Sequence, residues 1–546
     1  MAPIHSLDLD AAWHKSTLIQ LRTSKMKQMK NLSITTGIYK LPRTDRVFCT
    51  NTGLESDEHD LTFHGGFDKA VHQYYPGHYA SWQSEFPDAR DAFQIGGFGE
   101  NLVVDGNMNE RNVCIGDKIR VGEVLLQVSL PRQPCFKLNH RFGIKGFAPN
   151  TWKLSRTGWY YRVLEEGWMG VGDRMKLVER KYPNWTIERV QEYLHRDKSN
   201  LAKLEELGRI EEFGNECKEA FKRLIDGLKK ESGKVKEVEK WEEFELVEKN
   251  ILTKRISSFV LQAAGKGEGE DLDPGAFARL KLPNGLIRSY SIVGGSTNRL
   301  ELGIALEGES RGGSRYIHQE LKQGDKILVG KITESVPISG SFSNHIFIAG
   351  GIGITAFLSH IAAYSQINFN YELHYAVRSA DDVPYRNLLE KMGANVTIYD
   401  RSKGDRMDIP HILSTRRWNS FVYVCGPQRM IDDSVRAANS CGMSKDEIHY
   451  EAFQMATSGD PFTAELVKSK KTLEVGAEQT LLEVMREAGL DVDSSCEVGN
   501  CGTCRVEVCS GRVEHRGSGL SQEEKDDGKA MLSCVSRGLG HIVIDF

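Results

Sequence analysis

The sequence lacks the long apolar runs of membrane proteins and the leader of secreted ones. In this chain of 546 residues, no stretch approaches the roughly 18 uninterrupted apolar residues that a spanning helix needs. The opening, MAPIHSLDLDAAWHK, has no charged segment followed by an apolar one. We therefore expect a soluble, cytoplasmic protein with no membrane span. Residues 12–30 are basic and contain no acid, which leaves a mitochondrial matrix location open.

The sequence also lacks an excess of charge of either sign. Its 71 Lys and Arg residues are balanced by 75 Asp and Glu residues, which argues against a nucleic acid partner. The 11 cysteines are an odd number and are unevenly spread, so a disulfide framework is not expected. Their pattern favours metal ligands or reactive thiols. We expect small molecules and electrons to be the partners.

The residue pattern changes several times along the chain, and a length of 546 residues suggests about three to four domains. Short apolar runs broken by Gly, Pro and Asp indicate β-rich regions, and apolar residues at three- and four-residue spacing indicate helices. A charged connector covers residues 229–243. The predicted parts are a β-rich domain at 31–180, helices at 181–232, a second β-rich domain at 245–340, alternating strands and helices at 341–455, and a compact tail at 462–546.

Four cysteines in the tail give the strongest chemical signal. Cys496, Cys501 and Cys504 have the spacing C-x4-C-x2-C, and Cys534 follows later. A tight loop with three thiolates, closed by a fourth from elsewhere, is how a plant-type [2Fe-2S] cluster is held. Zinc is the alternative, but tetrathiolate zinc usually uses two C-x2-C pairs and only one is present. Cys509 is interpreted as a strand residue, and the tail resembles plant-type ferredoxin.

A flavin site is predicted in the second β-rich domain. Arg288, Tyr290 and Ser291 lie on a strand, and the run Ser310-Arg-Gly-Gly-Ser314 comes before a helix, where backbone N–H groups can bind phosphate. An ordinary exposed strand is the alternative for the first motif. The order of these motifs resembles the phthalate dioxygenase reductase family. That resemblance implies that Arg288, Tyr290, Ser291, Gly313 and Ser314 bind FMN rather than FAD.

A nicotinamide site is predicted in the alternating region. A glycine-rich turn follows an apolar strand and opens a helix, which lets backbone approach a pyrophosphate. The second motif is Cys-Gly-Pro after another strand, a pairing that resembles ferredoxin-reductase-like proteins, in which the cysteine lies near the nicotinamide. NADH is preferred by that likeness, although an arginine here could also serve a 2′-phosphate. The candidate residues are Gly350, Gly351, Gly353, Thr355, Arg378, Ser379, Cys425, Gly426 and Pro427.

Cys135, in the run SLPRQPCFKL, stands apart from the other cysteine chemistry. Together with FHGGFDKAVHQY, FGENLVV, VCIGDKIRVG and GWYYRVLEEGWMGVGD, this run resembles the MOSC domain of molybdenum-cofactor proteins. The helices after it resemble the extension of bacterial MOSC proteins that reduce N-hydroxylated purines. The resemblance implies that Cys135 ligates molybdenum and that Arg132, Lys69 and His64 contact the pterin cofactor. A half-buried structural thiol is the alternative.

These assignments predict a multidomain protein: a MOSC β-barrel with a small helical module, a flavin-binding β-barrel, an α/β nicotinamide-binding domain and an α+β ferredoxin of the β-grasp type. The predicted function is an oxidoreductase that passes electrons from NADH through FMN and a [2Fe-2S] cluster to a molybdenum cofactor and reduces N-hydroxylated compounds. A second hypothesis is a reductase for a separate oxygenase, with the MOSC domain used for docking. A third makes Cys135 a persulfide carrier.

Overall fold

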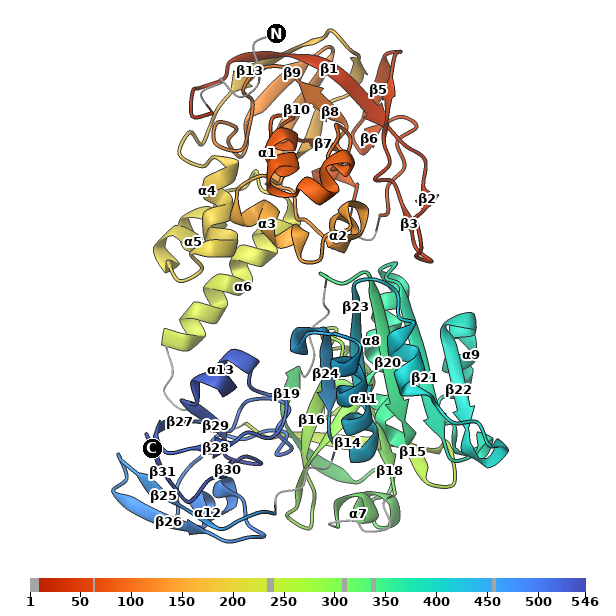
Figure 1. Cartoon of the computed structure of the whole chain (residues 1–546), viewed down its shortest axis with the longest axis vertical. Coiled ribbons are helices and arrows are strands. Elements are labelled where there is room, and N and C mark those ends of the chain that lie inside the picture. Colours follow the sequence, from red (N-terminus) through yellow and green to blue (C-terminus); the bar gives the residue numbers. More distant parts are fainter. Residues whose placement is uncertain (1–8, 62–63, 233–239, 307–311, 335–339, 454–457) are drawn as a thin grey trace. The chain divides into compact units, whose positions relative to one another are not determined.

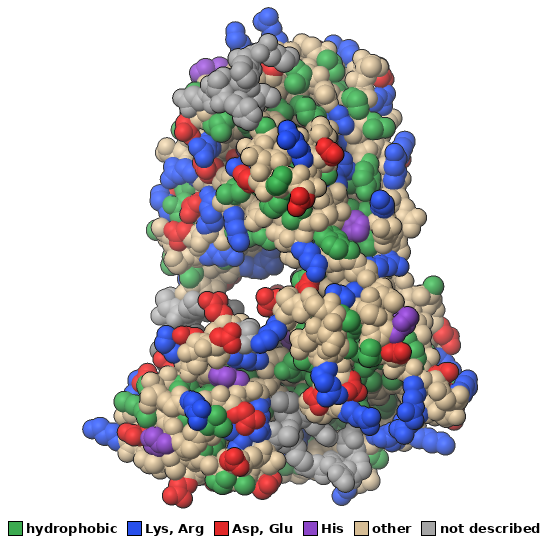
Figure 2. Space-filling view, viewed as in Figure 1, with side chains coloured by type: hydrophobic (Ala, Val, Ile, Leu, Met, Phe, Trp, Pro, Cys, Tyr) green, Lys and Arg blue, Asp and Glu red, His purple; other side chains and the backbone are tan. Residues whose placement is uncertain are grey.

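The computed structural model describes residues 9–61, 64–232, 240–306, 312–334, 340–453 and 458–546. It divides into two compact units (Figure 1). Unit 1 comprises Met1–Lys236 with Gly340–Ser343, and unit 2 comprises Glu237–Ser339 with Asn344–Phe546. Within the described ranges, no helix has the length and apolarity to cross a bilayer. Lys and Arg side chains are interspersed with Asp and Glu over the face shown in Figure 2.

Unit 1 is built on an eight-stranded sheet in the order β13-β9-β10-β11-β7-β8-β1-β4, in which β1 also pairs with β13. β10 is buried along its whole length, which explains its continuous apolar run. β1 pairs with three strands although it precedes residue 31, where the sequence places the domain boundary. The strands are β1 (Lys15–Thr23), β4 (Leu41–Arg43), β7 (Val71–Gln73), β8 (Leu102–Val104), β9 (Lys118–Val121), β10 (Val124–Pro131), β11 (Trp159–Glu165) and β13 (Arg174–Glu179).

The remaining elements of this domain are short helices and strands. An aromatic cluster that includes Tyr74, Trp82, Phe93, Phe98 and Phe147 packs among the helices that follow the strands. The remaining elements are β2 (Lys27–Gln28), β3 (Thr35–Thr36), β5 (Val47–Thr50), β6 (Gly53–Leu54), β12 (Gly167–Met169), η2 (Phe67–Lys69), α1 (His78–Glu85), η3 (Pro87–Ala92), α2 (Phe136–Phe142) and α3 (Phe147–Lys153).

A helical module completes unit 1, as the apolar spacing predicts. It consists of α4 (Ile187–Gln191), which continues into the π-helical turn η4 (Glu192–Arg196), then α5 (Leu201–Gly208) and α6 (Asn215–Ser232). Leu204, Leu207, Phe221 and Cys217 join the core of the barrel. Cys217 is 1% exposed, so this cysteine is a core residue.

Unit 2 begins with a closed six-stranded barrel in the order β14-β15-β18-β17-β16-β19. Its core is formed by alternating apolar residues such as Phe244, Leu261 and Leu302. The barrel elements are β14 (Glu242–Ile251), β15 (Ile256–Ala263), β16 (Ala276–Lys281), β17 (Ile287–Ser296), β18 (Arg299–Ala305), α7 (Gly313–Gln319) and β19 (Lys326–Glu334). Ser310 and Arg311 of the predicted flavin motif lie outside the described residues.

The alternating region forms a parallel sheet in the order β22-β21-β20-β23-β24. The chain leaves the central strand β20 toward β22 and then returns to β23 on the other side. This reversal makes a switch point at the carboxyl ends of β20 and β23, where ligands bind in open α/β sheets. The elements are β20 (Asn344–Gly350), η5 (Gly351–Ala356), α8 (Leu358–Gln366), β21 (Tyr371–Val377), η6 (Ala380–Asp382), α9 (Arg386–Met392), η7 (Gly393–Asn395), β22 (Val396–Asp400), η8 (Arg401–Lys403), α10 (Ile409–Ser414), β23 (Ser420–Cys425), α11 (Gln428–Ser440), η9 (Lys445–Glu447) and β24 (Ile448–Glu451).

The tail folds as a five-stranded mixed sheet in the order β26-β25-β31-β27-β29, with α12 packed against it. The loop that carries three of the predicted cluster cysteines runs between α12 and β27, and Cys534 follows β29, which pairs with β27. The elements are β25 (Phe462–Leu466), β26 (Lys471–Val475), α12 (Leu481–Glu487), β27 (Arg505–Ser510), β28 (Val513–Glu514), α13 (Gln522–Asp527), β29 (Ala530–Leu532), β30 (Arg537–Gly538) and β31 (His541–Ile544).

Candidate functional site

The carboxyl end of β10 leads directly into a cavity in unit 1. Cys135 is half-buried at the N-cap of α2 and lines this cavity of about 50 Å³. Four cationic side chains and three histidines share the lining. They are Lys40, Lys69, Arg132, Lys137, His59, His64 and His72. The structure thus brings together the four residues that the sequence singles out here, namely Cys135, Arg132, Lys69 and His64.

Arg132 differs from the other cations of this cavity. Lys40 pairs with Asp57, Lys69 pairs with Glu216, and Lys137 donates to Asp60 at 2.7 Å. Arg132 is only 4% exposed, and its Nε and Nη1 atoms have no hydrogen-bond partner among the described residues. A buried guanidinium without an anion is costly. The cavity is therefore suited to a negatively charged group.

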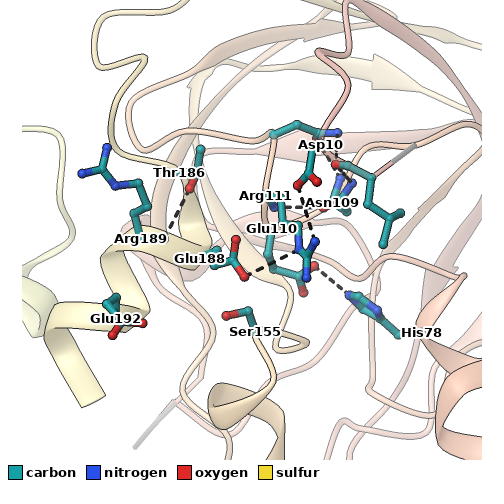
Figure 3. A network of polar contacts seen from close by, with 12 residues as sticks. Asp10, His78, Asn109, Glu110, Arg111, Ser155, Thr186, Glu188, Arg189 and Glu192 are labelled. Carbon is teal, nitrogen blue, oxygen red and sulfur yellow. Dashed lines mark hydrogen bonds and ion pairs between the residues drawn. The ribbon is translucent and has the colours of Figure 1, made fainter. Parts of the chain in front are cut away.

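A buried carboxylate fixes the backbone behind Arg132. The Arg132 N–H donates to the Gly158 carbonyl at 3.0 Å, and the Gly158 N–H donates to Glu110 Oε1 at 2.7 Å. Figure 3 shows the other Glu110 oxygen facing the ring of His78, with Nε2 at 2.7 Å. Gly158 has φ +75°, and a Cβ there would lie 2.4 Å from the Gln73 carbonyl oxygen. Only glycine fits this turn.

The same network joins the helical module to the barrel. The Glu188 N–H, in the first turn of α4, donates to the Glu110 carbonyl at 2.8 Å. Arg111 lies between Asp10 and Glu188 in Figure 3, with nitrogen–oxygen distances of 3.5 and 3.6 Å. Thr186 caps α4 by accepting the Arg189 N–H. The module therefore supports the turn that carries Gly158.

The histidines of the cavity add hydrogen-bonding groups rather than charge. Burial, reinforced by Lys137, Arg132 and Lys69, holds the pKa of His64 well below its usual value. Burial and Arg132 do the same to the pKa of His72. His59 has a pKa lowered by burial and by Lys40, which is partly offset by Asp57 at 3.3 Å. At neutral pH, these rings are uncharged and can hold or pass a proton.

In unit 2, the predicted flavin residues line one cavity of about 220 Å³. Arg288, Tyr290 and Ser291 enter it from β17, and Gly313 and Ser314 enter it from the start of α7. A Cβ on Gly313 would lie 2.7 Å from the Arg288 Cγ, so a larger residue here would displace the Arg288 side chain. Burial raises the pKa of Tyr290 to about 12, which keeps its phenol protonated as a hydrogen-bond donor. Thr355 and Glu451 of the α/β domain complete the opposite wall.

The ferredoxin loop reaches the same cavity, with Cys496 and Glu497 in its lining. Two hydrogen bonds hold the loop against the flavin barrel: Arg279 Nη1 donates to the Ser494 carbonyl at 2.8 Å, and Ser289 Oγ donates to the Ser495 carbonyl at 3.1 Å. Asn500 Nδ2 donates to the Ala452 carbonyl at 2.9 Å on the other side. Sequence reasoning missed these residues because no local motif marks them.

The four cluster cysteines form two pairs. The N–H groups of Asn500 and Cys501 lie 3.3 Å from Cys496 Sγ, and the Cys496 N–H lies 3.4 Å from Cys501 Sγ. The sulfur atoms of Cys504 and Cys534 lie 3.1 Å apart. In the described part of the chain, no three His, Cys, Asp or Glu side chains converge as they would on a single metal ion. Pairs of thiols fit a two-iron cluster, and the loop amides suit its sulfur atoms.

The predicted nicotinamide residues gather at the switch point of the parallel sheet. The glycine turn after β20 and the Cys425-Gly426-Pro427 turn after β23 are in contact, because a Cβ on Gly353 would lie 2.2 Å from the Cys425 carbonyl oxygen. Gly350 and Gly351 precede this contact, and Tyr375 donates to the Gly351 carbonyl at 2.8 Å.

Cys425 is fully buried, and burial holds the pKa of its thiol well above the usual value. Arg378 is exposed, and Ser379 follows it at the N-cap of η6.

Comparisons with known proteins agree with this arrangement. The MOSC domain model matches residues 60–176, and the 2Fe-2S iron-sulfur cluster binding domain model matches residues 465–537. A reductase of Gibberella moniliformis is 35% identical over 565 residues, which cover 99% of this chain and 97% of that protein. The heme-dependent oxidative N-demethylase beta subunit of Ectopseudomonas mendocina is 36% identical over 50% of this chain and 87% of its own length. The solved structure of phthalate dioxygenase reductase is 28% identical, covers 58% of this chain and 99% of its own, and has a TM-score of 0.45.

The full-length match and the two domain matches support an oxidoreductase with an iron–sulfur domain. The cavity lined by the predicted flavin residues and the loop with the paired cysteines both belong to unit 2, as does the switch point of the parallel sheet. The chain belongs to the same family as the Gibberella moniliformis reductase, and it carries a MOSC domain at residues 60–176 and a 2Fe-2S iron-sulfur cluster binding domain at residues 465–537.

Proposed function

We propose that this chain reduces N-hydroxylated compounds with electrons from NADH. The electrons pass through FMN and the [2Fe-2S] cluster to a molybdenum cofactor held at Cys135. The N–O bond of a hydroxylamine or amidoxime is broken with two electrons and two protons, and the oxygen leaves as water. The nicotinamide supplies two electrons and one proton, and solvent supplies the second proton.

The observation that carries this proposal is the unpaired Arg132 guanidinium in the cavity that Cys135 lines. A thiolate suits a metal already bound to sulfur, and the phosphate of a pterin cofactor suits a buried cation. The cavity, of about 50 Å³, is partly open to solvent. When bound, the cofactor supplies the two-electron reduction of the substrate.

One histidine of the cavity is positioned to donate a proton. His59 lines it, and its Nε2 lies 3.3 Å from Asp57, which is fully enclosed and also pairs with Lys40. The Asp57 carboxylate would stabilise the protonated form of the ring as an ion pair, whereas His59 Nε2 makes no hydrogen bond among the described residues. We assign His59 as the donor of a proton to the departing oxygen.

In unit 2, we assign Arg288, Tyr290, Ser291, Gly313 and Ser314 to FMN. The lining of one cavity by all five supports this assignment. Gly350, Gly351, Gly353, Thr355, Arg378, Ser379, Cys425, Gly426 and Pro427 are assigned to the nucleotide, and Cys496, Cys501, Cys504 and Cys534 to the cluster. The proposed domains are 31–180, 181–232, 245–340, 341–455 and 462–546, with the first extended to include β1.

A second candidate is a reductase that supplies a separate oxygenase. The name of the Ectopseudomonas mendocina relative, a beta subunit of a demethylase, favours it because a subunit acts with a partner. In that case, the MOSC domain would dock the partner or carry a persulfide on Cys135. Metal analysis distinguishes the two functions. Protein from a host that makes the molybdenum cofactor will contain molybdenum in the first case and iron alone in the second.

The experiment that tests the proposal is Cys135→Ala, with Cys441→Ala as the control because both thiols are half-buried. We expect Cys135→Ala to keep reduction of an artificial dye by NADH, which needs only unit 2. We expect it to lose bound molybdenum and the reduction of a hydroxylamine. The control should lose neither. Hydroxylamine reduction that survives in Cys135→Ala would make this thiol structural and overturn the proposal.

A further inference from the structure

The carboxyl edge of the parallel sheet carries a group of basic residues. Arg378 and Ser379 directly follow β21, the strand next to the glycine turn. In dinucleotide-binding folds, an acidic residue near this position accepts from the ribose hydroxyls of NAD, whereas an arginine accommodates the 2′-phosphate of NADP. This chain has arginine and serine here, so the edge lacks the acidic residue at that position.

The neighbouring strand offers one acid, but its carboxylate is already occupied. Asp400, at the end of β22, is 6% exposed. One oxygen accepts the Ser402 N–H at 2.9 Å and the Ser402 hydroxyl at 2.6 Å. The other accepts the Ala380 N–H at 3.0 Å. With these bonds made, Asp400 holds two turns together and is not available to ribose hydroxyls.

The two turns that Asp400 joins place further cations beside Arg378. The Ser402 N–H donates to the Arg378 carbonyl at 3.0 Å, which fixes Arg401 and Lys403 next to it. These three side chains are exposed. The guanidinium groups of Arg378 and Arg401 have no hydrogen-bond or ion-pair partner among the described residues. The nearby acids are Asp400, whose Oδ2 lies 4.0 Å from Lys403 Nζ, Asp381 and Asp382 on η6, and Asp405 after η8.

We propose that this edge binds the 2′-phosphate of NADPH, with Arg378, Arg401 and Lys403 as the cations. The chain then uses NADPH as well as NADH as its hydride donor. Hydride transfer to flavin is the same for both nucleotides, because the phosphate lies on the adenosine half. The proposal rests only on the reductase function of unit 2, so it can fail or hold independently of molybdenum.

The test compares kcat/KM for NADPH and NADH in the reduction of a dye by the full-length holoprotein. We expect the value for NADPH to be at least a tenth of that for NADH. The double variant Arg401→Ala with Lys403→Ala should lower the NADPH-to-NADH ratio about tenfold, the size of a lost charge-assisted hydrogen bond. Arg436→Ala, on α11 near the opposite edge of the sheet, is the control and should leave the ratio unchanged.

A binding measurement supports the kinetic one. Adenosine 2′,5′-bisphosphate should compete with NADPH at least tenfold more tightly than adenosine 5′-monophosphate in the parent protein, and the double variant should lose this difference. An NADPH value below a tenth of that for NADH overturns the proposal. So does a double variant in which both nucleotides lose activity equally or the ratio stays the same. Retained turnover with NADH shows that the double variant is folded.

Discussion

The buried guanidinium of Arg132 favours binding of an anion but lowers the stability of the protein when no anion is bound. Its guanidinium is buried and lacks a partner at two nitrogen atoms, although three lysines of the same cavity are paired. A protein gains nothing in folding from an unpaired buried cation, because desolvation of the charge is not offset. Such a residue is retained where it binds something. The pattern PRQPC placed Arg132 near Cys135 in sequence, but only the fold shows that two guanidinium nitrogens of Arg132 lack a hydrogen-bond partner among the described residues, although the group lies over the Phe98 ring.

This reasoning predicts the behaviour of Arg132→Met, which keeps most of the side-chain volume and removes the charge. In protein made without molybdenum cofactor, the variant should be more stable than the parent by about 1–3 kcal/mol. In protein made with the cofactor, it should lose most of its molybdenum. Thermal unfolding and metal analysis measure the two effects. A variant that is less stable and still retains molybdenum would contradict the role given to Arg132.

A histidine in the helical module makes the stability of unit 1 depend on pH. The ring of His195 stacks on Trp152, with centroids 5.0 Å apart. Burial, with Lys198 and Arg196, lowers the pKa of His195 to about 4. As pH falls below the usual histidine pKa of about 6.5, the unfolded chain takes up a proton that the folded chain does not. The contribution of the neutral ring to the free energy of unfolding is therefore present above the usual histidine pKa of about 6.5 and is lost as the pH falls toward 4.

We expect His195→Gln to flatten this dependence. Between pH 7 and pH 4.5, the free energy of unfolding of unit 1 should fall less in the variant than in the parent, by about 2 kcal/mol. Chemical denaturation at several pH values measures it. His541→Gln is the control, because that ring is exposed in the ferredoxin sheet. Equal pH slopes for the parent and His195→Gln would show that the ring does not titrate as described.

At the scale of elements, the cluster loop is fixed by segments far apart in sequence. Arg279 and Ser289 hold it from the barrel, and Asn500 holds it to Ala452 after β24. These contacts bring Cys496 into the lining of the cavity that Arg288 and Tyr290 also line, so under the proposed function they set the path from flavin to cluster. Loss of the Asn500 amide would leave the buried Ala452 carbonyl without this donor and loosen the loop.

Asn500→Ala should therefore slow electron transfer from flavin to cluster and leave the reduction of flavin by NADH unchanged. After rapid mixing with NADH, bleaching of the flavin should be unchanged, and bleaching of the cluster should be slower by about tenfold. Asn395→Ala, on η7 of the α/β domain, is the control. If Asn500→Ala reduces its cluster as fast as the parent, then the hydrogen bonds of this loop do not control the transfer.

The same elements show what sequence alone could and could not predict. The spacing of Cys496, Cys501 and Cys504 predicted the cluster loop, because the ligand geometry constrains a short segment. Strand-and-turn texture predicted the barrels and the parallel sheet, and apolar spacing predicted the helices. By contrast, the contact between Arg279 and Ser494 joins residues 215 positions apart and leaves no local pattern. The pairing of β1 with β4, β8 and β13 lies before residue 31, where the sequence texture placed the start of the first domain, because strand pairing between distant segments leaves no local pattern.

At the scale of the whole molecule, the fusion joins an electron-supplying unit to a cavity that can hold a redox centre. Unit 2 contains the switch point of the parallel sheet, the cavity lined by the predicted flavin residues, and the paired cysteines. Unit 1 contains the Cys135 cavity with its four cationic side chains. Under the proposed function, the two units together complete a reduction, whereas a reductase subunit passes its electrons to another protein. The account depends on discharge of the cluster into unit 1.

The most direct measurement follows the cluster after it has been reduced. The holoprotein is reduced without oxygen by one equivalent of NADH and then mixed with a hydroxylamine, while the iron–sulfur absorbance is recorded. Our account predicts that the absorbance returns in the parent protein and in Cys441→Ala, with formation of the amine, and that it stays bleached in Cys135→Ala. A cluster that remains reduced in the parent, with molybdenum present, would contradict the account.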